Sequence, residues 1–352
     1  MVRNVTGVRP RSSHLRVLRF SFFSPFVFST VLCALSVMIC TQEAVAQDTT
    51  PSNPTIRTNV QVVLVPVTVT DRKGKFVDGL TTEDFVVSDE GVRQKIRMDT
   101  SDTVVAPVSL VVAIQCSGIS AAALAKIEKV GAMIQPLVIG DRGKAAVVAF
   151  DDEVRVFQDF TSDGTKIRVA FEKVQGRVIM AGRMIDAAAE SVKMLETRPE
   201  SSRRILLILS ESRDRGSKAK LPQVVEQAQR AGVMIYPATY SVHATPWTAR
   251  PEDNPTMPGG PGPILGTIIE LARMGKINDA DAFAQATGGR HLSFETLKGL
   301  EETIARAGEE IHSQYLLSFV PQSSSGGFHR VAVEVPSHPD AMVRARPGYW
   351  GQ

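Results

Sequence analysis

Cysteine is scarce in this sequence, with three residues in 352. Cys33 and Cys40 lie in an apolar N-terminal segment, so Cys116 is the one cysteine in the rest of the chain. A protein that keeps a single thiol has no internal disulfide, and its stability must come from a buried core. Since Cys116 closely follows an apolar run, we expect it to be a buried and unreactive thiol.

Histidine is also sparse, with six scattered residues. The sequence has no His-Glu-x-x-His motif, no Cys-x-x-Cys pair and no glycine-rich phosphate loop. A nucleophile elbow needs glycine two residues before the nucleophile. Here Ile114 holds that position for Cys116, and Gln115 holds it for Ser117. We therefore expect no enzymatic activity, and we interpret His291, at the start of a short strand, as structural.

The chain lacks a strong excess of charge of either sign. Its formal net charge is +3, but residues 1–46 hold five arginines and one glutamate, so the remaining residues carry about −1. A globally basic surface for nucleic acid is therefore not expected.

The N-terminal segment has the three parts of a secretory signal. Five arginines up to Arg19 precede an apolar run over 20–40, and Ala44-Val45-Ala46 supplies small residues for cleavage. We predict cleavage after Ala46 and export to the periplasm, the outer envelope or the medium, with no membrane insertion of the mature chain. An uncleaved membrane anchor is the alternative, because the apolar run is nearly long enough to span a bilayer.

The first region of the mature chain has the pattern of β structure. Residues 47–55 are a polar linker with two prolines, and 56–103 reads as strands and turns. Val60–Val69 predicts a long strand, and Pro66 favours an edge position because proline cannot donate a ladder hydrogen bond. Asp89-Glu90-Gly91 between apolar runs predicts a hairpin turn.

From Pro107 onward, buried strands alternate with amphipathic helices. Apolar runs such as Val108–Ile114 and Ile205–Leu209 fit strands that are buried on both faces. This alternation predicts a mostly parallel sheet covered by helices on both faces, over residues 106–312. We expect further strands at Ala145–Phe150, Val154–Phe160, Val233–Thr239 and His291–Phe294, and helices at 124–137, Gly164–Val174, Arg183–Glu196, Leu221–Ala231 and 297–312.

The end of the chain, residues 313–352, returns to a β pattern. Neither this region nor 56–103 has enough strands to bury a core alone. We therefore expect the two regions to pair into one small β-sandwich, with the α/β domain inserted between them. The C-terminal strands are expected at Tyr315–Val320, Val331–Val335 and Met342–Arg346.

These motifs resemble the von Willebrand factor type A family, in particular its exported acidobacterial members. Val108–Ile114 followed by Cys116-Ser117-Gly118 resembles the first strand and metal loop of the family, and 204–211 and 232–239 resemble its fourth and fifth strands. The resemblance implies a Rossmann-like sheet whose carboxyl edge forms a binding rim. Two further segments resemble the acidobacterial members, Thr68–Gly91 and the ending Arg346-Pro347-Gly348-Tyr349.

The metal ligands that the resemblance implies are mostly missing. In the family, an Asp-x-Ser-x-Ser loop, a threonine and a further aspartate hold a divalent ion, and an acidic group of the partner completes the shell. Mg²⁺ needs six oxygen ligands and carboxylate charge. Here the first aspartate is Gln115, the second serine is Ile119 and the threonine is Gly182. Ser117 is kept and Glu211 replaces the last aspartate, so we expect no bound Mg²⁺ and no cofactor.

The resemblance implies a non-enzymatic module that binds another protein. Loops at the rim carry Arg177, Arg183, Arg213 and Arg215. We expect a fixed arginine, above all Arg183, to replace the lost cation and hold an acidic group, although solvated rim arginines are the simpler interpretation. A metal-dependent adhesion module and a structural subunit of an envelope assembly remain alternatives. The expected partner surface comprises Gln115, Ser117, Arg183, Glu211, Arg213 and Trp247.

Overall fold

A computed structural model describes residues 62–99, 106–117, 128–177, 181–240, 278–294, 297–322 and 326–351. The chain divides into two units, Met1–Thr58 and Asn59–Gln352, and all the described residues belong to the second. The expected signal segment, the linker 47–55, Ile119 and Trp247 lie outside the described residues. Among the residues that are described, no helix is long and apolar enough to cross a membrane.

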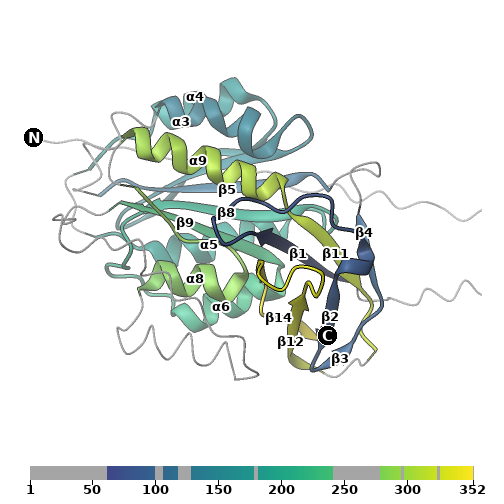
Figure 1. Ribbon diagram of the computed structural model, residues 1–352. Coiled ribbons are helices and arrows are strands. Elements are labelled where there is room, and N and C mark those ends of the chain that lie inside the picture. The colour runs from purple at the N-terminus through teal and green to yellow at the C-terminus, as the bar shows by residue number, and fades with distance from the viewer. Residues whose placement is uncertain are drawn as a thin grey trace, which may run out of the picture. The chain divides into compact units, whose positions relative to one another are not determined.

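The described strands of the α/β part form one sheet in the order β10-β9-β8-β5-β6-β7 (Figure 1). All neighbouring strands are parallel except β7, which is antiparallel to β6. Numbered from β5, this is the 3-2-1-4-5-6 order of a doubly wound sheet, and it confirms the predicted fold class. The strands are β5 (Val108–Gln115), β6 (Lys144–Phe150), β7 (Val154–Thr161), β8 (Arg203–Ser210), β9 (Val233–Tyr240) and β10 (Leu292–Phe294).

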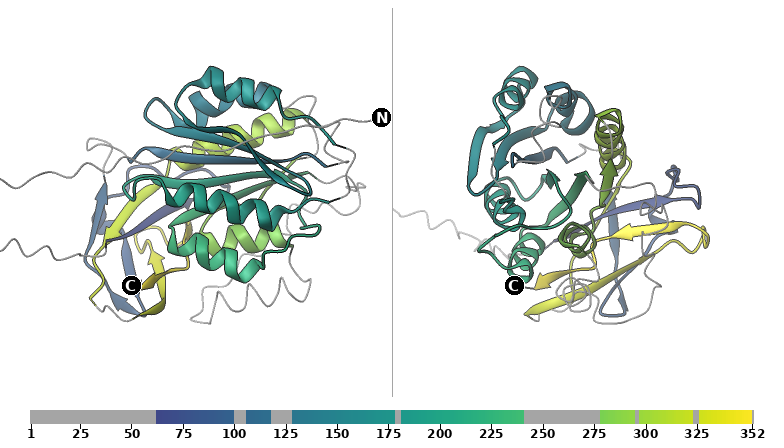
Figure 2. Two further views of the ribbon diagram at one scale, coloured as in Figure 1. Left: turned by 180° about the vertical axis from the view of Figure 1, so that it is seen from behind. Right: turned by 90° about the vertical axis from the view of Figure 1, so that its left-hand side faces the viewer.

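Helices cover both faces of this sheet, as the right-hand view of Figure 2 shows. One face packs against α3 (Glu128–Met133), the π-helical η2 (Ile134–Ile139), α4 (Gly164–Glu172) and α9 (Leu297–His312). The other face packs against α5 (Met184–Glu196), α6 (Leu221–Arg230) and α8 (Asp279–Thr287).

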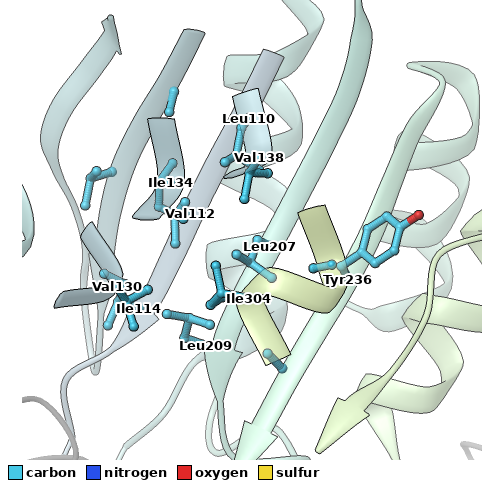
Figure 3. Packing of buried hydrophobic residues seen from close by; sticks show 14 of the residues in the cluster. Leu110, Val112, Ile114, Val130, Ile134, Val138, Leu207, Leu209, Tyr236 and Ile304 are labelled. Atoms are coloured by element: carbon cyan, nitrogen blue, oxygen red, sulfur yellow. The ribbon is translucent and has the colours of Figure 1, made fainter. Parts of the chain in front are cut away.

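The core of the first face shows why its strands are apolar at every position. Val112 of β5 lies among Ile134 of η2 and Ile304 of α9, and all three are fully buried (Figure 3). Ala113, the next residue of β5, is equally buried in the core of the other face. Successive side chains of such a strand point to opposite faces of the sheet, and helices cover both faces. No side chain of the strand is exposed to solvent, so the sequence is apolar at every position and does not alternate with polar residues.

The terminal β regions form two four-stranded antiparallel sheets, in the orders β13-β1-β11-β4 and β14-β12-β2-β3. Each sheet combines strands from both ends of the chain, as we expected, since β1 pairs with β11 and β2 pairs with β12. Their shared core contains Val65, Val67, Leu317 and Tyr349. The strands are β1 (Val63–Thr70), β2 (Val86–Asp89), β3 (Val92–Arg93), β4 (Ile96–Asp99), β11 (Tyr315–Phe319), β12 (Gly327–Glu334), β13 (Met342–Ala345) and β14 (Gly348–Gly351).

Two predictions from local sequence in the β region, a hairpin turn and an edge strand, had different outcomes. The hairpin turn between β2 and β3 is confirmed, with Glu90 at φ 47° and Gly91 at φ 82°, the left-handed values that a type I′ turn requires. The edge position predicted from Pro66 is wrong, because β1 lies between β11 and β13. The ladder to β13 begins at Val67, one residue after the proline, so pairing on that side never requires Pro66.

Candidate functional site

The candidate site lies at the carboxyl edge of the six-stranded sheet, where β5 and β8 end. The side-chain amide of Gln115 donates to Ser117 Oγ at 2.7 Å, and its Oε1 accepts from the backbone N–H of Glu211 at 2.9 Å. A Cβ added to Gly182 would lie 2.6 Å from Gln115 Nε2 and 3.4 Å from Ser117 Oγ. The structure therefore brings together four of the residues that the resemblance assigns to the metal site.

These residues do not provide the ligands that Mg²⁺ needs. Gln115 supplies a neutral amide whose nitrogen and oxygen are both engaged, and Gly182 has neither a ligand atom nor room for one. The carboxylate of Glu211 is paired with Arg215 at 2.8 Å. A hard cation that demands several anionic oxygens would have to break these contacts to bind.

Asp151, which follows β6, is the charged centre of the rim and was missed by the sequence interpretation. Its side chain is fully buried and accepts from Arg155 Nη2 at 2.6 Å and from Arg177 Nη1 at 3.1 Å. Burial would raise the pKa of this carboxyl, but hydrogen bonds and the two guanidinium groups outweigh that effect and lower it. The available sequence signal was the Asp151-Asp152 pair, which directly follows a buried strand.

The ion pairs at the rim divide its arginines into two groups. Arg177 is held by Asp151 and Arg215 by Glu211, so their charges are already neutralised. Arg183 and Arg213 form no ion pair within the described part of the chain. The half-buried Arg183 is the N-cap residue of α5. Its Nε is buried without a hydrogen-bond partner, and its backbone N–H donates to the carbonyl of Asp151 at 2.9 Å.

The predicted partner surface is divided by depth. Gln115 and Ser117 are 2% and 3% exposed, so they form the floor of the rim and do not reach its surface. Glu211 and Arg183 are half-buried, and Arg213 is exposed. No hydrogen bond joins Arg183 to Ser117 in the structure, so an arginine that reaches the floor stays a prediction.

A second polar cluster lies where α8 packs on the end of β9. His291 Nδ1 lies 2.5 Å from Asp281 Oδ1, and its Nε2 lies 2.6 Å from the hydroxyl of Thr239. The order Thr–His–Asp resembles a catalytic triad, but Thr239 is 4% exposed and its hydroxyl is inside the fold. The contacts join a helix to a strand, which fits the structural interpretation of His291.

The thiol of Cys116 is also inside the fold. The residue is 1% exposed, and burial, together with the charge of Asp151, raises the pKa of the thiol to about 11. A thiol with a pKa this high stays protonated and is a poor nucleophile at neutral pH.

Solved structures that are partly similar to this chain share little of its sequence. No family model matches this chain, and no curated protein matches its sequence. An aerotolerance-related membrane protein from Bacteroides fragilis is 12% identical, with a TM-score of 0.40 over 57% of this chain and 98% of that chain. BatB from Bacteroides thetaiotaomicron is 13% identical, with a TM-score of 0.39 over 57% and 99%. The VWA domain of SpRpn10 is 11% identical, with a TM-score of 0.36 over 57% and 93%.

The fold assignment rests on the described sheet itself. Its strand order, its one antiparallel neighbour and the helices on both faces are those of a doubly wound domain. Ser117, Gly182 and Glu211 converge at its carboxyl edge around Gln115, where the sequence motifs placed the metal loop. The α/β part of this chain therefore has the doubly wound fold that the resemblance to the von Willebrand factor type A family implies.

Proposed function

We propose that the α/β part is a non-enzymatic module that binds an acidic group of another protein at the rim, without a metal ion. The observation that carries this proposal is the position of the Gln115 amide. It stands where the family has a carboxylate ligand, and it is hydrogen-bonded on both sides, to Ser117 and to Glu211. Polar groups that satisfy one another in this way need no cation to compensate them.

Arginine supplies the positive charge in this proposal. Arg183 directly follows Gly182 and is the N-cap residue of α5, so its backbone is fixed beside the floor of the rim. A guanidinium can donate two parallel hydrogen bonds to a carboxylate and keeps its charge at any physiological pH. Truncating an arginine whose contact with an acidic group is buried in the complex costs on the order of 2–5 kcal/mol of binding free energy. The exposed Arg213 adds longer-range attraction that salt screens.

We also propose that the protein acts outside the cytoplasm. The arginine-rich start, the apolar run and Ala44-Val45-Ala46 support cleavage and export. The partner is then a protein of the periplasm, the outer envelope or the medium. In this proposal Trp247, which lies outside the described residues, contributes an apolar contact to the partner, as tryptophan does in many interfaces.

The test is a capture experiment on envelope extracts with the mature protein, residues 47–352. Wild type, Arg183→Gln and Arg213→Gln are compared with and without EDTA and at two salt concentrations. Lys298→Gln is the matched control, because this lysine is exposed on α9 and pairs with Glu302 within the same helix.

The proposal predicts that a specific partner is captured in EDTA, that salt weakens capture, and that Arg183→Gln abolishes it while Lys298→Gln does not. Capture that disappears in EDTA would instead support a metal-dependent adhesion module. Capture that survives both rim substitutions would contradict the proposal. The contact would then lie elsewhere, for example on the β-sandwich of this protein, as expected of a structural subunit of an envelope assembly.

A further inference from the structure

A cavity of about 680 Å³ lies at the amino-terminal edge of the six-stranded sheet. Its walls come from the start of β1, the first residues of β8 and β9, the end of α6, and β14. The rim lies at the carboxyl edge of the same sheet, so the two sites are on opposite edges. The volume falls within the roughly 300–1,000 Å³ of pockets that hold small organic molecules.

The charges that line this cavity are mostly positive. Glu200 is the carboxylate in the lining, and Glu226 pairs with one lining arginine, Arg230, at 2.9 Å. The remaining lining arginines make no ion pair with a carboxylate in the part of the chain that the structure describes. The four arginines of the lining are Arg203, Arg204, Arg230 and Arg346.

Arg346 is held in place by backbone carbonyls alone. Its Nε donates to Gly348 O at 2.8 Å, its Nη2 to Gln229 O at 2.9 Å and its Nη1 to Leu64 O at 3.4 Å. These bonds use three of the five guanidinium N–H groups and leave two for a ligand. Burial lowers the pKa of Arg346 to about 10, as expected for a cation with no anion beside it.

Arg203 and Arg204 repeat this arrangement at the start of β8. Arg203 is 4% exposed, donates to the carbonyls of Ala106 and Ile311, and has a pKa lowered to about 10 by burial. Arg204 donates to Ala231 O at 2.8 Å, and burial lowers its pKa although the charge of Glu200 opposes that effect. Buried charges are normally paired, and Arg203 is fixed in position without an ion pair to any described carboxylate.

The rest of the lining is apolar. Val63, Pro66 and Met234 contribute aliphatic surface. The indole of Trp350 is a further wall, and the Arg230 guanidinium stacks over it at 4.2 Å from the ring centroid. A ligand that fits this lining carries its charge at one end and an apolar body at the other.

We infer that this cavity binds a small organic anion, with a carboxylate or phosphate head held by Arg204 and Arg346 and an apolar body against β1 and Trp350. Fixed guanidinium groups bind such heads through charge-assisted and often bidentate hydrogen bonds. The anion supplies the counter-charge that the described residues do not.

The test uses calorimetry and thermal melting of the mature protein with two anionic probes, octanoate and phenyl phosphate. Each has an uncharged control of similar shape, 1-octanol and phenol. The variants are Arg204→Gln and, because it is half-exposed on the surface of α6, Arg230→Gln. Arg213→Gln, at the opposite edge of the sheet, is the matched control.

We expect at least one anionic probe to bind and to raise the melting temperature, with at least tenfold weaker binding in Arg204→Gln and unchanged binding in Arg213→Gln. A preference between octanoate and phenyl phosphate then identifies the head group. The inference is overturned if neither anion binds, if the uncharged controls bind equally well, or if a folded Arg204→Gln variant binds as wild type does. If Arg204→Gln does not fold, unchanged binding in Arg230→Gln overturns it.

Discussion

The side-chain amide of Gln115 donates a hydrogen bond of 2.7 Å to the hydroxyl of Ser117. This contact closes the floor of the rim with two neutral groups, at a position where the resemblance would have implied a charged one. The same amide accepts from the backbone of Glu211, so one residue joins the ends of β5 and β8. The rim is therefore held together by hydrogen bonds of its own, and our predictions follow from that arrangement.

Gly182→Ala is predicted to destabilise the fold by about 1–3 kcal/mol, the usual cost of overpacking a closed site. The added Cβ would lie 2.6 Å from Gln115 Nε2 and would force the amide away from Ser117. Urea unfolding measures the change. Gly326→Ala is the control, because a Cβ there meets no atom within 4 Å. Equal stability of the two variants would show that the amide is not held as the structure indicates.

Asp151→Asn is predicted to lower stability at pH 7 by about 1–3 kcal/mol. The loss is smaller than for a fully buried pair, because Arg155 and Arg177 are partly exposed to solvent. The folded pKa of Asp151 is lowered, so its contribution is present above the unfolded value of about 3.9 and is lost as the pH falls below it. Unfolding free energies of wild type and variant should therefore converge as the pH falls below about 4. A constant difference over that range would contradict this role of the carboxylate.

Deletion of residues 314–352 is predicted to unfold the N-terminal β region and to leave the α/β part folded. The deletion removes β11, which lies between β1 and β4, and β12, which pairs with β2. Strands without partners expose their backbone groups and lose their core. Limited proteolysis with mass spectrometry should show rapid cleavage within 62–99. Protection of that region in the truncated protein would refute a shared core.

Export is predicted to yield a mature protein that begins at Gln47. The basic start, the apolar run and the small residues up to Ala46 carry this prediction. N-terminal sequencing of protein from periplasmic, membrane and cytoplasmic fractions tests it. A full-length chain in the cytoplasm would contradict export, and a full-length chain in the membrane would support an uncleaved anchor.

The sequence was most informative where structure depends on local pattern. Continuous apolar runs located the strands of the central sheet, and Gly232, at φ 64°, ends α6 where a helix stop was expected. The resemblance also assigned Gly182 and Ser117 to one site, and the structure brings these two residues together.

The sequence was least informative where structure depends on distant pairing. The edge position predicted from Pro66 was wrong because the pairing of β1 with β13 begins one residue after the proline. That register depends on residues nearly 280 positions later in the chain. The bond from Glu211 N to Gln115 spans 96 positions and has no local signal. Asp151 was missed because its two arginines are recognised only when the rim is assembled.

The central claim, a rim that works without metal, is tested most directly by calorimetric titration of the mature protein with Mg²⁺ and with Mn²⁺. We expect no stoichiometric binding of either ion. Gln115 and Gly182 stand where metal ligands would be needed, and the carboxylate of Glu211 is paired with Arg215. A single site of micromolar affinity that disappears in Ser117→Ala would contradict it.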